Sequence, residues 1–292
     1  MSYPGGKNRV YQHLINLIPY HTAYFAPFLG EDAIMQHKRP AIMNVGLDVD
    51  KDVITRWQKG TIKPAPGTPP TPHYMILAHD HTRPTADTTI NGVTAPPPHL
   101  KVAAPITRYG STEAPPIPVM KPGADPARYR TRHAFIHADY KYALCNWPFT
   151  HRHFVYIDAP YLQDVRASQR PLYNHEFNTE EQHCELLQIA LKLPCMVMIS
   201  HYAHPLYTNT LSTWNTASYT TYTRSGRAVR EYLWMNYDQP THLHDYSFIG
   251  NDYRQRETIK KKQDRWVENW AELPHLERRA ILRRLAELEM LA

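Results

Sequence analysis

The sequence predicts an α/β fold built on a mostly parallel sheet with helices on both faces. Three observations predict this class: short apolar runs alternate with helically spaced apolar residues, acidic residues directly follow several of these runs, and the pattern continues on both sides of one proline-rich stretch. Strands that alternate with helices favour parallel pairing through right-handed crossovers. The 292 residues are 42% hydrophobic and 21% charged, which suits a large domain with a buried core.

Before the proline-rich stretch, the sequence predicts a helix, a strand and a second helix. Val10, Leu14 and Leu17 have helical spacing and predict a helix over residues 8–17. Residues 42–49 form an apolar run typical of a buried strand. A helix is expected over residues 52–58.

After the proline-rich stretch, further short apolar runs predict strands. Residues 134–137, 154–157 and 195–200 are buried-strand candidates. Residues 218–223 and 231–236 are expected to be antiparallel strands at the edge of the sheet.

Two later stretches have a helical pattern. Residues 179–193 begin with Thr-Glu-Glu, which is typical of a helix start, and they place Cys184, Leu187 and Leu191 on one helical face. Residues 251–292 are helical in pattern and rich in arginine and lysine. Trp266 and Trp270, four positions apart, are expected to pack in the core.

Proline divides the chain into its expected parts. Fifteen of the 26 prolines lie between residues 60 and 133, where they exclude a long helix. We therefore expect an irregular insertion over residues 60–133. It interrupts a catalytic domain made of residues 1–59 and 134–250, and residues 251–292 form a basic helical extension.

Composition narrows the class of protein. The formal net charge of +6 favours a polyanionic partner. No apolar run approaches the roughly 20 residues that span a bilayer, and residues 1–10 lack the apolar segment of a secretory signal, so we expect a cytoplasmic protein without a membrane partner. Cys145, Cys184 and Cys195 show no paired spacing and are expected to be free thiols. No metal is expected, because His79-Asp80-His81 and His242-Leu243-His244 lack a second cluster at ligand spacing.

Two segments early in the chain have the character of ligand-binding loops. Tyr3-Pro4-Gly5-Gly6-Lys7 combines glycines, which let the backbone approach a ligand, with a cationic head. Pro27-Phe28-Leu29-Gly30-Glu31-Asp32-Ala33-Ile34 resembles a loop at the end of a strand that leads into a helix. Asp48 follows about twenty residues later, the spacing at which a doubly wound fold holds a ribose hydroxyl. A capping loop and a surface aspartate are the simpler alternatives.

Two more segments deliver acids from strand ends. His137-Ala138-Asp139-Tyr140 places Asp139 where it could accept from the exocyclic amine of an adenine ring or cap a helix. Val155-Tyr156-Ile157-Asp158-Ala159-Pro160-Tyr161 brings an acid, a carbonyl and an aromatic ring to the carboxyl edge of the sheet. The carboxylate and the carbonyl can both accept from one amino group, and the tyrosine ring can stack on a base.

In this order, the segments YPGGK, PFLGEDAI, GLDVD, HADY and IDAPY resemble the motifs of the Dam-like class of N6-adenine DNA methyltransferases, in which the last motif is usually Asp-Pro-Pro-Tyr. Three further stretches resemble phage and prophage members: LYNHE at residues 172–176, ISHY at 199–202 and EYLWMNY at 231–237. The resemblance covers most of residues 1–59 and 134–292. It implies the Rossmann-like methyltransferase fold, with the target-recognition region in the proline-rich insertion.

The resemblance also implies a role for each motif residue. S-adenosylmethionine would be the cofactor, with Tyr3, Gly5 and Lys7 near its methionine part, Phe28 and Gly30 in the loop beneath it, Asp48 on its ribose, and Asp139 and Tyr140 on its adenine. Asp158, Ala159, Pro160 and Tyr161 would hold the target adenine. A base in a duplex cannot reach such a pocket, so the target must be flipped out of the stack.

The resulting expectation is methyl transfer to adenine N6 in double-stranded DNA, in a bacterial or phage-infected cell and in the context of restriction and modification. Arg254, Arg256, Lys260, Lys261 and Lys262 are candidate DNA-binding residues. Three alternatives stay open: the same chemistry on RNA, transfer to cytosine N4, and a weak or inactive DNA-binding relative. Glu31-Asp32 motivates the last alternative, because these acids replace small residues of the family loop. An NAD-type enzyme is disfavoured, since the loop is not G-x-G-x-x-G. The oligomeric state is left open.

Overall fold

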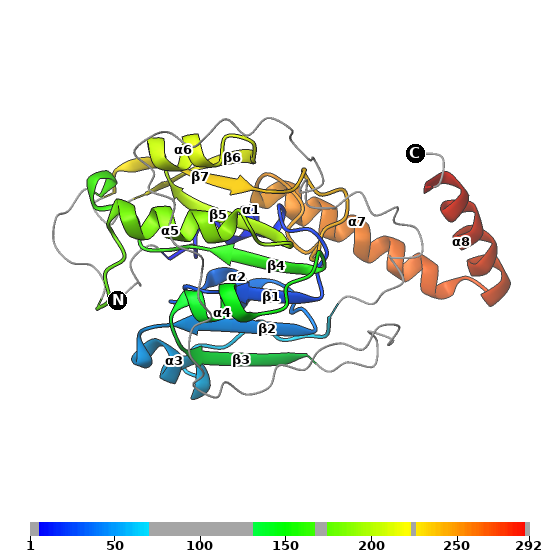
Figure 1. Cartoon of the computed structure of the whole chain (residues 1–292). Coiled ribbons are helices and arrows are strands. Elements are labelled where there is room, and N and C mark those ends of the chain that lie inside the picture. Colours follow the sequence, from blue (N-terminus) through cyan, green and yellow to red (C-terminus); the bar gives the residue numbers. More distant parts are fainter. Residues whose placement is uncertain (1–5, 70–130, 167–173, 223–225, 290–292) are drawn as a thin grey trace.

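The computed structural model describes residues 6–69, 131–166, 174–222 and 226–289 (Figure 1). Within them, seven strands form one sheet in the order β3-β2-β1-β4-β5-β7-β6. The strands are β1 (Ala23–Ala26), β2 (Met43–Asp48), β3 (Arg132–His137), β4 (His153–Ile157), β5 (Met196–Tyr202), β6 (Asn215–Tyr222) and β7 (Ala228–Met235). The first five strands run parallel, and β7 pairs antiparallel with both β5 and β6.

Helices cover both faces of this sheet. On one face, α1 (Tyr11–Ile15), α2 (Ala33–His37) and α3 (Lys51–Gln58) bury aliphatic and aromatic side chains against it. On the other face, α4 (Tyr140–Asn146), α5 (Glu180–Ala190) and α6 (Pro205–Thr210) do the same. The predicted Rossmann-like fold class, a mostly parallel sheet with helices on both faces, is confirmed.

The sheet topology fixes where a ligand can bind. From β1 the chain moves outward to β2 and β3, then returns across β1 to β4 and continues to β5. The strand order therefore reverses between β1 and β4, and crevices at such a reversal are the usual ligand sites of open α/β sheets.

Two local predictions are wrong in instructive ways. The strand at residues 231–236 is not at the edge, because β7 lies between β5 and β6 and only β6 is an edge strand. The buried face of α5 contains His183, Leu186, Leu187 and Ala190 in place of the expected Cys184 and Leu191. Leu191 is the C-cap residue and is largely exposed, since the helix ends before the expected boundary.

The last two described helices extend away from the sheet. These are α7 (Tyr253–Glu272) and α8 (His275–Glu289), which Figure 1 shows to the right of the sheet. The predicted helical extension is present, but the expected core packing of Trp266 is wrong, because this side chain is 64% exposed. No described helix is both long and apolar enough to cross a bilayer.

Most of the proline-rich insertion lies outside the described residues. The predicted domain boundaries therefore remain predictions. The three cysteines are free thiols, as expected.

Candidate active site

A cavity of about 290 Å³ opens at the reversal point of the strand order. Every described residue that the sequence analysis assigns to cofactor or target base lines it: Lys7, Phe28, Gly30, Asp48, Asp139, Tyr140, Asp158, Ala159, Pro160 and Tyr161. They come from the segments that follow β1, β2, β3 and β4, and from the chain before α1. Tyr3 and Gly5 lie outside the described residues.

The loop after β1 is anchored against β2. The Leu29 amide donates to the Leu47 carbonyl at 2.8 Å, and the indole of Trp57 donates to the Gly30 carbonyl at 2.9 Å. Gly30 has φ +43°, a conformation that glycine adopts readily. A Cβ at Gly46 would lie 2.6 Å from the Leu29 side chain, so a glycine in β2 is what allows the loop to lie this close.

Asp48, at the end of β2, supports the same loop. Its carboxylate accepts from the Gly30 amide at 2.9 Å and from the Asp50 amide at 2.8 Å. Burial raises the pKa of Asp48, and these two hydrogen bonds work in the opposite direction. The carboxylate thus lies in the cavity wall in a fixed orientation, with lone pairs left for a ligand.

Glu31 and Asp32 each have a local partner. Glu31 forms a 2.7 Å ion pair with Arg56 of α3. Asp32 caps α2 by accepting from the Ile34 amide and also accepts from the Tyr24 hydroxyl at 2.7 Å. Burial raises the pKa of Asp32 to about 6, so its negative charge is costly in the folded protein. Asp32 therefore has a structural role as well as lining the cavity.

An aromatic group forms one wall of the cavity. Phe28 stacks on Tyr140 with ring centroids 5.1 Å apart, and Phe177 meets both rings edge-on. Asp139 caps α4 through the Lys141 amide, so the alternative role proposed for it is realised while the residue also lines the cavity. Flat apolar rings beside an exposed carboxylate suit a heteroaromatic ring that bears an amino group.

Asp158 lies at the centre of a buried cluster of charges (the Lys7 cluster: Lys7, Asp158, Tyr161 and Glu231). The Lys7 ammonium is 2.8 Å from Asp158 Oδ1, 2.8 Å from Glu231 Oε1 and 2.9 Å from the Tyr161 hydroxyl. The Tyr161 hydroxyl also donates to Glu231. From the other side, Ser200 donates to Asp158 Oδ1 at 2.8 Å.

Two carboxylates therefore share one ammonium group. Burial acts to lower the pKa of Lys7, but Asp158 and Glu231 outweigh it and hold the pKa well above its ordinary value. Burial raises the pKa of Asp158; Lys7 opposes this rise and Glu231 adds to it. With Lys7 charged and both acids ionised, the cluster has a net charge of −1.

Side chains below the cavity fix the segment after Asp158. The His201 ring accepts from the Leu162 amide at 3.0 Å and donates through its other nitrogen to the Tyr202 carbonyl. Burial lowers the pKa of His201 well below its usual value, so the ring is neutral and can accept. Arg166 donates to the Tyr161 carbonyl at 2.6 Å and pairs with Glu176.

The sequence analysis assigned no role to Ser200, His201 or Glu231. These residues do lie within two stretches that carry the family resemblance, residues 199–202 and 231–237. The signal was an acid and a serine in otherwise apolar strand sequences.

A second group of ligand-type side chains lies outside the cavity. Asp164, Glu180 and His204 bring one potential ligand atom each within 4.8 Å of one another. However, His204 Nδ1 accepts from the Leu206 amide, so a neutral ring carries its proton on Nε2 and donates it to Asp164 at 2.8 Å. Nε2 then has no lone pair for a metal, and the group is explained as the cap of α6.

The five candidate DNA-binding residues lie on α7 and do not line the cavity. Figure 1 shows α7 on the right of the sheet, while α3, which begins after the carboxyl end of β2, lies on the left. Most of these side chains are exposed, with Arg256 half-buried.

Comparisons with known proteins add little to this geometry. No protein-family model matches the chain, and no curated protein matches it. The chain is similar to the solved structure of M. capricolum TrmK with S-adenosyl-homocysteine, with 7% identity over 94% of this chain and 93% of that chain at a TM-score of 0.37. It is also similar to an rRNA methylase from Streptococcus thermophilus, with 7% identity over 79% of this chain and 95% of that chain at a TM-score of 0.33. At these TM-scores neither likeness carries an argument about function.

Proposed function

We propose that the chain is an S-adenosylmethionine-dependent methyltransferase that acts on the N6 amino group of adenine in DNA. The observation that carries the proposal is the cavity itself. Asp158, the Ala159 carbonyl and Tyr161 line the same cavity as the Gly30 loop and Asp48. A donor and an acceptor of a methyl group must meet in one such space.

The charge of the cavity supports a cationic cofactor. Among its described lining residues are seven acids and one lysine; the acids are Glu31, Asp32, Asp48, Asp50, Asp139, Asp158 and Glu176. S-adenosylmethionine carries a sulfonium cation, which such a lining attracts. The pyrophosphate of a dinucleotide would be repelled, so the same lining counts against an NAD-type enzyme.

Individual residues fit the parts of this cofactor. The Asp48 carboxylate, fixed by two amides, can accept from ribose hydroxyls. Phe28 and Tyr140 can enclose the adenine ring, with Asp139 at its amino group. When bound, the cofactor supplies a methyl group that its sulfonium charge has already activated.

The chain's own residues then prepare the acceptor. The amino group of adenine is a poor nucleophile because its lone pair is delocalised into the ring. Hydrogen bonds from its two protons to Asp158 and to the Ala159 carbonyl favour a pyramidal nitrogen with an available lone pair. Asp158 can accept the proton that this nitrogen loses as the methyl group arrives, and its raised pKa makes it the stronger base.

Lys7 has to yield its place during this process. Its ammonium group contacts both oxygens of Asp158, at 2.8 and 2.9 Å, and these are the atoms an incoming amino group needs. Glu231 offers Lys7 a second carboxylate at 2.8 Å, so the ammonium can stay paired when it leaves Asp158. The exchange leaves no buried charge without a partner.

The nucleic acid and the base are the finer parts of the proposal. Asp158, where the cytosine-N4 enzymes of this resemblance have serine, favours adenine. The basic residues of α7, Arg254, Arg256, Lys260, Lys261 and Lys262, are proposed to contact phosphates. RNA is the second candidate substrate, and the recognition sequence is assigned to the proline-rich insertion.

One experiment tests the whole proposal. The purified protein is incubated with methyl-labelled S-adenosylmethionine and either duplex DNA, RNA or no nucleic acid. DNA from cells that express the protein is sequenced by a long-read method and scored for N6-methyladenine and its flanking bases. We expect label in DNA and a methylated adenine in one sequence context; Asp158→Asn is the matched inactive control. Label in RNA alone would replace the substrate, and the absence of both transfer and cofactor binding would refute the proposal.

A further inference from the structure

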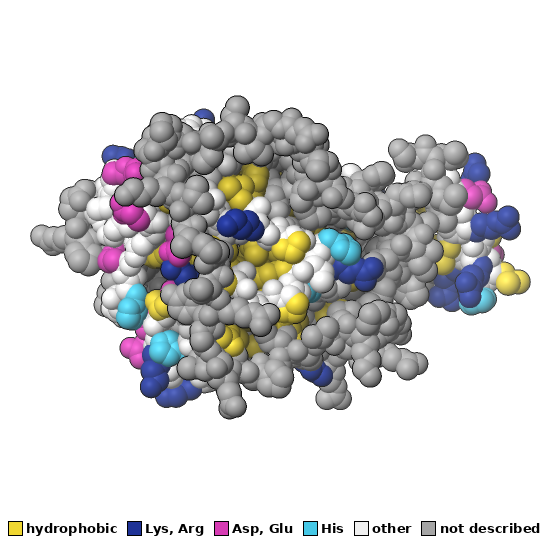
Figure 2. Space-filling model, in the orientation of Figure 1, with side chains coloured by type: hydrophobic (Ala, Val, Ile, Leu, Met, Phe, Trp, Pro, Cys, Tyr) yellow, Lys and Arg dark blue, Asp and Glu magenta, His cyan; other side chains and the backbone are white. Residues whose placement is uncertain are grey.

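Helix α8 exposes a row of aliphatic side chains with nothing packed on it. Ile281, Leu285 and Leu288 have the 4,3 spacing of a coiled-coil seam, and Leu282 lies beside them. Leu285 is 51% exposed and Leu288 49%. Within the described part of the chain, neither α7 nor α8 packs substantially against another helix or strand. Figure 2 shows hydrophobic side chains among Lys and Arg at the right-hand end, where Figure 1 shows α8.

We propose that this row is a self-association surface, through which two copies of the chain pair by their α8 helices in antiparallel orientation. Charges beside the row favour this partner. Glu277 and Arg284 are seven positions apart and flank the seam on the same side. In an antiparallel pair, Glu277 of one copy lies opposite Arg284 of the other, and two-fold symmetry repeats the contact.

A parallel pair is disfavoured by one residue. Arg278 lies in the seam, three positions before Ile281. Parallel pairing would place the two Arg278 side chains opposite each other, and like charges in contact repel. Antiparallel pairing places Arg278 near Leu288 and Glu289 of the second copy.

The composition of α8 suits a second copy better than nucleic acid. The helix contains four arginines and three glutamates, so it is self-complementary in charge. Arg283 and Arg284 already contact Glu287, at 3.3 and 3.2 Å. A phosphate-binding surface needs unopposed cations, whereas an aliphatic seam with mixed charges on its flanks is typical of paired helices.

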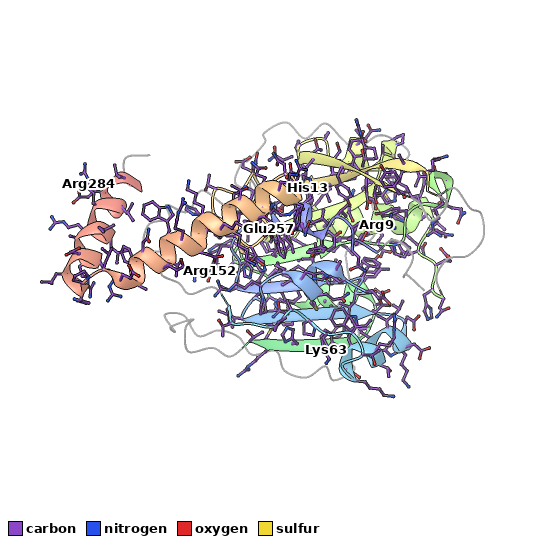
Figure 3. All side chains as sticks on the ribbon, turned by 180° about the vertical axis from the view of Figure 1, so that it is seen from behind. Arg9, His13, Lys63, Arg152, Glu257 and Arg284 are labelled. Carbon is purple, nitrogen blue, oxygen red and sulfur yellow. The ribbon has the colours of Figure 1, made fainter. Side chains whose placement is uncertain are left out.

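The position of α8 leaves room for the second copy. Figure 3 shows Arg284 on α8 far from the sheet, while Glu257 lies where α7 passes the body of the protein. A pair of 15-residue helices buries less than the roughly 1,600 Å² of a standard stable interface, so the dimer is weak and depends on concentration.

Sedimentation equilibrium of the full chain tests the proposal. We expect the mass of the wild-type protein to rise from one copy to two as its concentration increases into the range of about 100 μM. Leu285→Asp should remain a single copy. Leu276→Asp is the matched control, because Leu276 is 80% exposed but projects from the opposite side of α8, and it should associate like the wild type.

Charge reversal tests the antiparallel register. Glu277→Arg alone and Arg284→Glu alone should each associate about tenfold more weakly, since each turns two attractive contacts into repulsive ones. An equal mixture of the two variants should associate again, because every cross-pair is then attractive. Circular dichroism checks that the variants keep their helix content. A wild-type protein that stays single, a Leu285→Asp variant that associates normally, or a mixture that does not recover would each overturn the proposal.

Discussion

Replacing Glu231 by glutamine is expected to move the acid limb of the methyl-transfer pH profile to lower pH. Glu231 and Asp158 each contact the Lys7 nitrogen at 2.8 Å, so their contacting oxygens lie no farther apart than twice that distance. Two negative charges at this separation repel by about 3 kcal/mol at an effective dielectric constant of about 20. Glu231 thus opposes the ionisation of Asp158, in the same direction as burial, which is the larger cause of its raised pKa.

The sign follows from the proposed mechanism. Asp158 must be ionised to accept from the amino group, so activity falls as the pH drops through its pKa. Glutamine keeps an acceptor for Lys7 and Tyr161 but removes the charge, and Asp158 then ionises at lower pH. Since Lys7 screens about half of the repulsion, the limb should move by about one pH unit.

The assay is kcat/KM for methyl transfer to DNA between about pH 5 and 9, which reports groups of the free enzyme. Ser200→Ala is the matched control, because it removes a hydrogen bond that lowers the pKa of Asp158, and its acid limb should move to higher pH. If both limbs moved in the same direction, or neither moved, the electrostatic reasoning would be wrong.

Three further changes test separate parts of the structure. Asp158→Asn should reduce methyl transfer by a factor of about 10³ while calorimetry finds nearly unchanged cofactor affinity; equal losses of both would contradict its assigned role. Gly46→Ala places a Cβ 2.6 Å from Leu29, so the unfolding free energy measured with urea should fall by about 1–3 kcal/mol, and an unchanged value would show that the loop adapts freely. Burial lowers the pKa of Lys38 from 10.5 to about 7, so between these pH values the unfolded chain holds a proton that the folded chain lacks, and stability should rise with pH. Lys38→Met should abolish that rise, and a variant whose stability has the same pH slope as the wild type would contradict the assignment.

The site could be predicted largely because it is made of strand ends. Asp48, Asp139 and Asp158 each follow an apolar run, and parallel strands bring their carboxyl ends to one edge of a sheet. Local pattern therefore predicted which residues meet in the cavity, without any knowledge of long-range contacts. The Gly30 loop was predictable for a similar reason, since it follows a strand and leads into a helix.

The partners of Asp158 could not be predicted in this way. Lys7 is 151 positions from Asp158, and Glu231 is 70 positions from Tyr161. Glu231 reaches the cavity only because β7 inserts between β5 and β6, which the alternation of the sequence does not encode. The exposure of Trp266 has the same origin: helical spacing identifies an apolar face but not whether another element covers it.

The separation of charge on the molecule gives the proposed function a physical consequence. The acids around the cavity would repel the phosphates of a duplex that approached it directly. A neutral base extruded from the stack carries no such charge at its amino edge, so the cavity admits the target base and rejects the backbone. Phosphate contacts must then come from cationic surface away from the cavity, and α7 provides one such surface among the described residues. Base flipping is therefore required by the electrostatics of the cavity as well as by its shape.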